Sequence, residues 1–307
     1  MRLLLLGGNG QVGRELRRSL LPLGEVIVAT RDGADADAVA DFDVPDALAE
    51  LVASLAPDVV VNAAAYTAVD RAETDGEAAW RINAEAPAVL ANACAATNAL
   101  LVHYSTDYVF DGSGNRPYRE DDATAPLGVY GSSKLAGEEA IRASDARYAI
   151  LRTAWVYAAH GKNFLLTMLR LAGERDELRV VADQVGAPTP AAWIADATAQ
   201  LIRHGVGGHG ATGSGTWHLV ADGETSWHGF AEAIVEEANA RGLVARAPHV
   251  AAIATSDYPT PAKRPAYSVL DTSRLRRDFG IVLPDWREGL RRTLDEFVAC
   301  HPARSEA

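Results

Sequence analysis

Residues 3–13, LLLLGGNGQVG, decide the fold of this chain. The short apolar run predicts a buried strand, and the spacing of Val12, Leu16 and Leu20 after it predicts a helix. Between them lie three glycines in the pattern G-x-x-G-x-x-G, whose missing side chains allow backbone N–H groups to approach a diphosphate. A plain tight turn is the alternative. We predict a dinucleotide site in this turn, formed by Gly7, Gly10, Gln11, Val12 and Gly13.

The alternation of strand and helix continues as far as residue 152. Short apolar runs predict further strands at 26–29, 58–62, 100–104 and 148–151. Amphipathic stretches predict helices at 11–21 and 45–55, a long one ending near residue 96, and one at 132–143. Continuous apolar strands separated by helices are typical of a parallel sheet covered on both faces. We therefore expect a Rossmann-type, doubly wound α/β fold.

The pattern changes after residue 152, where glycine and proline become dense. A strand at 216–219 and helices at 226–240 and 286–298 predict a smaller mixed α/β lobe at the C-terminal end, and the glycine-rich stretch 205–215 predicts a surface loop. We expect a dinucleotide-binding domain at 1–152, to which later segments return. The remainder is expected to be a mainly substrate-binding lobe at 153–300 and a tail at 301–307.

Composition and charge exclude several classes of function. Apolar residues make up 48% of the 307, which is enough for a core and excludes a disordered chain. With 29 Lys and Arg against 41 Asp and Glu, the net charge of −12 disfavours nucleic acid and anionic membranes as partners. No apolar run is long enough to span a bilayer, and residues 1–6 lead directly into a strand, so we expect a cytoplasmic enzyme. Cys94 and Cys300 lie too far apart to indicate a disulfide framework or a zinc site, and no metal is expected.

The end of the second strand bears on the choice of cofactor. An acid that binds the adenosine ribose is typical of this position in NAD enzymes, whereas Thr30 and Arg31 stand there in this chain. A cation next to the strand suits a 2′-phosphate, so we predict NADPH, with NADH as an alternative donor and a solvated Arg31 as the alternative interpretation. Further cofactor contacts are expected from Asp41 and Phe42 at the adenine and from the small residues after the next strand, Ala63, Ala64 and Ala65.

A second pattern carries acid–base chemistry. Tyr130 and Lys134 form Y-x-x-x-K at the start of a helix, and residues four apart share one helical face. A neighbouring cation favours phenolate, so we expect a lowered pKa at Tyr130 and a role as general acid or base. Tyr130 and Lys134 are also expected to contact the cofactor, Lys134 at the nicotinamide ribose. Thr106 ends a predicted parallel strand, where ligands bind, and its hydroxyl is expected to hold a substrate carbonyl. His103, within that strand, is expected to be a core residue or to support the site from behind.

Together these patterns resemble the extended short-chain dehydrogenase/reductases. Six ordered segments are similar, in more detail, to the dTDP-4-dehydrorhamnose reductase family, and they are 61–70, 105–112, 129–138, 152–157, 183–189 and 258–265. The resemblance implies that Thr106, Tyr130 and Lys134 are catalytic. It also implies a sugar-nucleotide pocket lined by Val69, Thr106, Asp107, Tyr108, Tyr130 and Trp155.

The implied reaction is reduction of the C4 keto group of dTDP-4-dehydro-6-deoxy-L-mannose to dTDP-L-rhamnose. Lys263 and Arg264, in a loop bounded by prolines, are the candidates for the diphosphate of the substrate, with a structural ion pair of Arg264 as the alternative. Two other functions remain open. One is a related nucleotide-sugar reductase, epimerase or dehydratase, although Tyr108 stands where such dehydratases carry a glutamate. The other is a non-catalytic NADP-binding regulatory subunit.

The chain is expected to be a monomer or a homodimer. The resemblance also implies that some members dimerise around magnesium through surface acids. Glu15 could match one of these acids, but the others are not identified in this sequence, so that dimer is not predicted.

Overall fold

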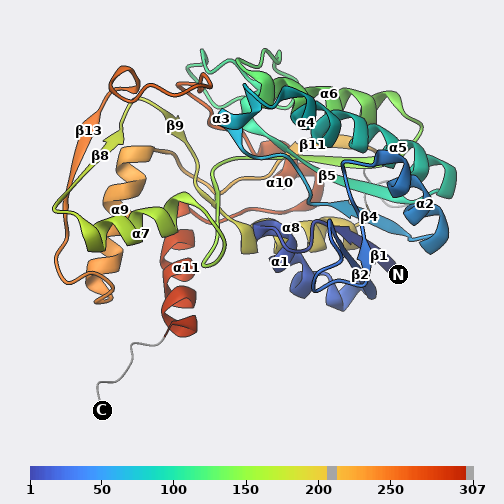
Figure 1. The fold of residues 1–307 in the computed structure, drawn as a ribbon, viewed down its shortest axis with the longest axis horizontal. Coiled ribbons are helices and arrows are strands. Elements are labelled where there is room, and N and C mark those ends of the chain that lie inside the picture. The colour runs from blue at the N-terminus through green and yellow to red at the C-terminus, as the bar shows by residue number, and fades with distance from the viewer. Residues whose placement is uncertain (206–212, 302–307) are drawn as a thin grey trace.

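The computed structural model describes residues 1–205 and 213–301 of the chain. The predicted glycine-rich loop at 205–215 and the predicted tail at 301–307 therefore lie largely outside the described residues. Two parts are visible in Figure 1, one built on a large sheet and a smaller one that contains α7, α9, β8 and β13.

A seven-stranded parallel sheet forms the larger part, in the order β11-β6-β5-β4-β1-β2-β3. The strands are β1 (Arg2–Leu6), β2 (Glu25–Thr30), β3 (Ala38–Val39), β4 (Val59–Asn62), β5 (Leu100–Thr106), β6 (Arg147–Thr153) and β11 (Gly215–His218). The order reverses direction at β1, which pairs with β2 on one side and β4 on the other. This arrangement confirms the predicted doubly wound fold, and the reversal opens a crevice at the carboxyl ends of β1 and β4.

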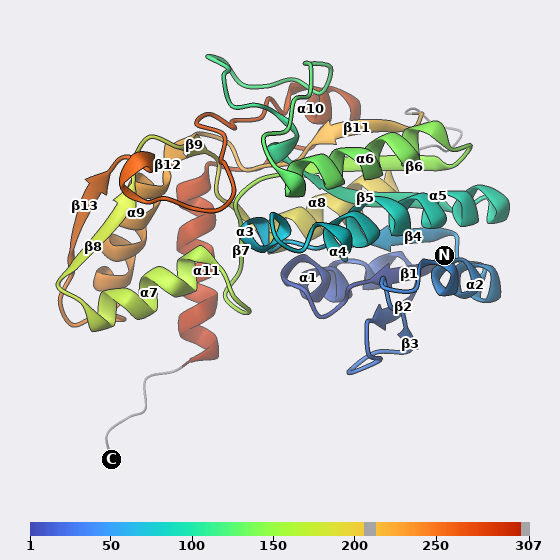
Figure 2. The same ribbon diagram turned by 45° about the horizontal axis from the view of Figure 1, so that its top comes forward.

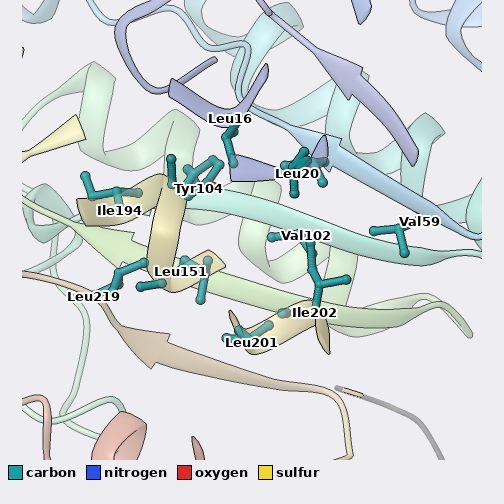
Figure 3. Close-up of a cluster of buried hydrophobic side chains, with 14 of the residues drawn as sticks. Leu16, Leu20, Val59, Val102, Tyr104, Leu151, Ile194, Leu201, Ile202 and Leu219 are labelled. Carbon is teal, nitrogen blue, oxygen red and sulfur yellow. The ribbon is translucent and has the colours of Figure 1, made fainter. Parts of the chain in front are cut away.

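Alternate residues of β1 supply two separate cores because successive side chains point to opposite faces of a sheet. Leu3 and Leu5 join a cluster with α1 (Gln11–Ser19), α8 (Ala191–Arg203) and α10 (Ser273–Phe279), part of which is drawn in Figure 3. Leu4 and Leu6 join another with α2 (Pro45–Leu55), α5 (Ala86–Thr97) and α6 (Val129–Ala143). All four leucines are fully buried, so the first strand is fixed between two helical layers.

The predicted long helix ending near residue 96 is divided into several parts. It comprises α3 (Val69–Ala72), α4 (Gly76–Trp80), a π-helical turn at Arg81–Glu85 and α5. Pro87 lies in the first turn of α5 and has no N–H for the regular helical hydrogen bond, which accounts for the wider turn before it.

The smaller part has its own buried core between three helices and a pair of parallel strands. Its elements are α7 (Phe164–Glu174), β8 (Glu177–Val181), α9 (Trp227–Ala240), β13 (His249–Ile253) and α11 (Trp286–Cys300). Short strands link it to the sheet, and they are β7 (Val156–Tyr157), β9 (Val185–Gly186), β10 (Thr189–Pro190) and β12 (Thr225–Ser226). Figure 2 shows α11 alongside α9, on the side of the lobe nearer the sheet. The proposed domain boundary after residue 152 falls at the end of β6 and stays a prediction.

Among the described residues, no helix has the length and apolar character needed to cross a membrane.

Candidate active site

A cleft of about 490 Å³ opens at the carboxyl ends of the central strands. Most of the residues predicted to bind a cofactor line it, namely Gly7, Gly10, Gln11, Val12, Arg31, Asp41, Phe42, Ala63, Ala64, Ala65, Tyr130 and Lys134. The glycine turn, the loop after β4 and the start of α6 therefore meet at one site, although they are separated by more than a third of the chain.

Gly7 and Gly13 shape the turn between β1 and α1. Gly7 has φ +76°, and a Cβ there would lie 2.7 Å from the backbone nitrogen of Ala64. A Cβ on Gly13 would lie 2.1 Å from the carbonyl oxygen of Gly7. Gly13 is buried and does not line the cleft, so its part is to let α1 pack against the turn.

Arg31 lies at the rim of the cleft and is paired with two acids. Its guanidinium contacts the carboxylate of Asp43 and lies 3.5 Å from that of Asp41. Asp32, its neighbour in the sequence, accepts a hydrogen bond from the backbone of Ala34 instead. Thr30 is buried and donates to the carbonyl of Ala34, so it does not line the cleft.

Tyr130 lies in the first turn of α6 with Tyr108 and Thr106 beside it. Its ring meets that of Tyr108 edge to face at 5.5 Å, and its hydroxyl is hydrogen-bonded to Thr106. Burial raises the pKa of Tyr130 to about 12, while the bond with Thr106 acts in the opposite direction. The expected lowering is therefore wrong for the protein alone, because desolvation of the phenolate outweighs the neighbouring groups.

Lys134 is held by hydrogen-bonding groups of β5. Its ammonium nitrogen lies 2.6 Å from the carbonyl oxygen of Tyr104 and 3.2 Å from Nε2 of His103, and only 2% of the residue is exposed. Burial lowers the pKa of Lys134 to about 8. His103 supports the site from behind, as its position within β5 indicated.

Thr106 is the last residue of β5 and Asp107 follows it, next to Tyr130 at the cleft. The Thr106 hydroxyl donates to Asp107 at 3.0 Å, and its oxygen accepts from the backbone of Tyr108. Burial raises the pKa of Asp107 to about 6. Both residues are almost fully buried, and neither lines the cleft in this state.

A second cavity of about 430 Å³ lies at the smaller lobe. Aromatic side chains and arginines line it, among them Phe164, Trp227, Tyr258, Arg175, Arg179 and Arg264. Arg264 also makes a bidentate ion pair with Asp70 of α3, at 3.0 and 2.8 Å. The structural ion pair that the sequence left open is thus present, and the same side chain still borders a cavity.

Like Thr106 and Asp107, the predicted substrate contacts Tyr108, Val69 and Trp155 line neither cavity. Trp155 stacks on Trp227 with ring centroids 3.6 Å apart, so it backs the wall of the second cavity. It adopts φ +49°, an uncommon conformation for a residue with a side chain. Val69 begins α3, next to Asp70.

Sequence reasoning missed several residues that line the first cleft, including Asn9, Asp43, Thr67, Ile82, Thr153 and Lys162. Lys162 follows Gly161, where a Cβ would lie 3.3 Å from the side chain of Gln11. Lys162 thus lines the same cleft as the glycine turn although it is about 150 residues away in the chain, and no local pattern marks it. Among the described residues, no group of three or more His, Cys, Asp or Glu is arranged to hold a metal ion.

The fold and the cleft define a nicotinamide-dependent oxidoreductase of the short-chain dehydrogenase/reductase type. A family model described as "RmlD substrate binding domain" matches residues 1–299. The chain is 52% identical to a dTDP-4-dehydrorhamnose reductase of Burkholderia thailandensis, over 94% of this chain and 96% of that protein. It is 49% identical to the Escherichia coli K12 protein of the same name, over 96% and 98%. This chain belongs to the dTDP-4-dehydrorhamnose reductase family, which confirms the resemblance and the prediction of an oxidoreductase.

Solved structures agree with this membership. A dTDP-4-dehydrorhamnose reductase from Bacillus anthracis, in complex with NADP, has a TM-score of 0.87 and 34% identity, covering 96% of this chain and 99% of that one. The UDP-glucose 4-epimerase of Thermus thermophilus, in complex with NAD, has a TM-score of 0.79 at 20% identity and shares the fold alone.

Proposed function

We propose that this protein reduces the C4 keto group of dTDP-4-dehydro-6-deoxy-L-mannose to dTDP-L-rhamnose, with NADPH as hydride donor and Tyr130 as general acid. The observation that carries the proposal is the meeting of Tyr130, Lys134 and the glycine turn at one cleft. The reductase names of the similar proteins and the NADP complex of the Bacillus anthracis relative support it.

The residues of the cleft fit a dinucleotide. The backbone at Gly7 and Gly10 has no side chain between it and the cleft, and α1 begins there without a side-chain cap on its N–H groups. Lys162 and Arg31 add positive charge at two points of the same cleft. When bound, NADPH supplies the hydride that the carbonyl carbon receives.

Tyr130 completes the reduction by donating its proton to the carbonyl oxygen as negative charge develops there. A phenol whose pKa is raised to about 12 is protonated at neutral pH, as the reductive direction requires. Its hydrogen bond with Thr106 fixes the phenol at the end of β5, where the substrate oxygen is expected to lie. Such a positioned acid contributes about 10²–10⁴-fold in rate.

The second cavity suits the nucleotide part of the substrate. Three aromatic rings can pack against a base, and Arg175, Arg179 and Arg264 supply local charge for a diphosphate in a chain of net charge −12. Arg175 and Arg179 line this cavity and form no ion pair with another described residue, so their guanidinium groups are open to a ligand. Arg264 uses most of its donors within the protein.

The experiment that tests this function measures NADPH oxidation by the purified protein with the 4-keto sugar nucleotide, followed by identification of the sugar product. We expect stoichiometric formation of dTDP-L-rhamnose, and faster reaction with NADPH than with NADH. A protein that binds NADPH but oxidises none of it with any 4-keto sugar nucleotide would be the regulatory subunit instead.

A further inference from the structure

Three buried polar side chains form a continuous chain beneath the cleft. Asn62 at the end of β4 lies 3.0 Å from Nδ1 of His103 on β5, and Nε2 of His103 lies 3.2 Å from the amine of Lys134 on α6. The three residues are 1%, 1% and 2% exposed. Because solvent cannot satisfy these groups, each must donate to or accept from its neighbour.

The direction of these hydrogen bonds is set by a backbone group. The N–H of Ala64 can only donate, and it lies 3.1 Å from Oδ1 of Asn62. The amide nitrogen of Asn62 therefore faces His103 and donates to Nδ1, which must carry a lone pair. Burial keeps the pKa of His103 well below its usual value, so the ring is neutral and carries its hydrogen on Nε2.

That hydrogen points at Lys134. An ammonium group has three donors and no acceptor, so it faces the Nε2–H unfavourably, whereas a neutral amine offers a lone pair to it. We propose that Asn62 and His103 are positioning residues that fix the Nε2–H tautomer and thereby favour the neutral amine of Lys134.

Other groups around Lys134 act in the opposite direction. The carbonyl of Tyr104 accepts a hydrogen bond from it, and Glu138, one turn further along α6, favours the ammonium. Glu138 is itself neutralised by Arg142 and Arg152. Burial favours the amine, and Tyr130 is a neutral phenol. Burial and the direction of the Asn62–His103 bond therefore favour the amine, while the Tyr104 carbonyl and Glu138 favour the ammonium.

This inference rests on the proposed function only for what it means for the reaction, namely the protonation of Tyr130. A Lys134 that gives up its proton more readily stabilises phenolate less, so Tyr130 keeps more firmly the proton that reduction of a carbonyl needs. The Ala64 N–H that orients Asn62 belongs to the same loop that lines the cleft, so the cofactor site and the state of Lys134 share one fixed hydrogen bond.

Lysine NMR tests the proposal without any catalysis. The chain has three lysines, Lys134, Lys162 and Lys263, so ¹³C-lysine labelling gives three side-chain signals, assigned with Lys162→Arg and Lys263→Arg. Asn62→Asp offers an acceptor to Nδ1–H, moves the lone pair to Nε2 and should raise the Lys134 pKa by at least about one unit, a tenfold change in its protonation equilibrium. His103→Leu removes the opposing N–H and should also raise it.

The control is Asn83→Asp. Asn83 is a fully buried asparagine that donates to Ser133, beside Lys134, and makes no hydrogen bond to His103. Its replacement by aspartate therefore adds a buried carboxylate next to the same helix. We expect a clearly smaller rise there than in Asn62→Asp. A fall of the Lys134 pKa in His103→Leu would show that His103 accepts from the ammonium and would overturn the proposal.

The unmodified protein gives a reading that does not depend on how the variants fold. ¹⁵N shifts of His103 should report the neutral Nε2–H tautomer, and an Nδ1–H tautomer would contradict the proposal. Because none of these readouts uses turnover, an inactive protein with the expected pKa shifts would refute the proposed function and leave this inference standing.

Discussion

Replacing Arg264 by alanine separates two roles of one side chain. The guanidinium binds Asp70 through two hydrogen bonds, at 3.0 and 2.8 Å, and it borders the second cavity. If it also contacts the substrate diphosphate, its loss should raise the KM for the sugar nucleotide about tenfold or more, because hydrogen bonds to charged groups contribute about 1.5–3 kcal/mol.

The cost in stability should be smaller. The Asp70 side chain is 42% exposed, so solvent screens the pair, and about 1 kcal/mol is a reasonable contribution. In a chain of this length that corresponds to a fall in Tm of about 2 °C.

Asp70→Asn is the matched variant, because it weakens the ion pair and leaves Arg264 in place. Steady-state kinetics and thermal unfolding on both variants and on the double variant give a complete cycle. We expect similar losses of Tm in the two single variants, but a tenfold rise in KM only where Arg264 is missing. Equal KM values for both single variants and the unmodified protein would refute a diphosphate contact and leave Arg264 a structural residue.

Three further predictions follow from single side chains. Arg31→Ala should raise the KM for NADPH several-fold and leave that for NADH nearly unchanged, since a 2′-phosphate is the difference between the two, and equal changes in steady-state assays would exclude this role. Lys162→Ala should raise both KM values together because its side chain lies near the glycine turn, and a change confined to NADPH would place it at the 2′-phosphate instead. Glu138→Gln should lower the free energy of unfolding by about 3–5 kcal/mol, because it leaves the guanidinium of Arg152 buried beside a neutral group, and urea unfolding with a loss below about 1 kcal/mol would contradict this.

The parts of the site that the sequence predicted are those encoded by local spacing. The glycine turn and the Tyr130–Lys134 pair each lie within a few residues, and the strands around them read as apolar runs. The parts it did not predict depend on contacts between distant segments. Lys162 lines the same cleft as the glycine turn only because of the fold. Arg175 and Arg179 likewise line one cavity with Arg264, which lies in the loop at 258–265.

Neighbours in the sequence are not neighbours in the site at two positions. The pKa of Tyr130 was expected to fall because a lysine lies four residues away, but the structure directs Lys134 towards His103 and Tyr104 and buries the phenol. Arg31 lies next to Asp32 in the sequence, yet it pairs with Asp43. In both cases sequence proximity did not determine which groups share a space.

The role of Tyr130 as proton donor is the central claim, and single-turnover reduction of the 4-keto sugar nucleotide by Tyr130→Phe tests it most directly. The variant keeps the ring and removes only the hydroxyl, so NADPH affinity, measured separately by fluorescence titration, should stay within a few-fold of the unmodified protein. We predict that the rate of the reductive step falls at least about a hundredfold. A reductive step as fast as that of the unmodified protein, with NADPH bound equally well, would contradict the account.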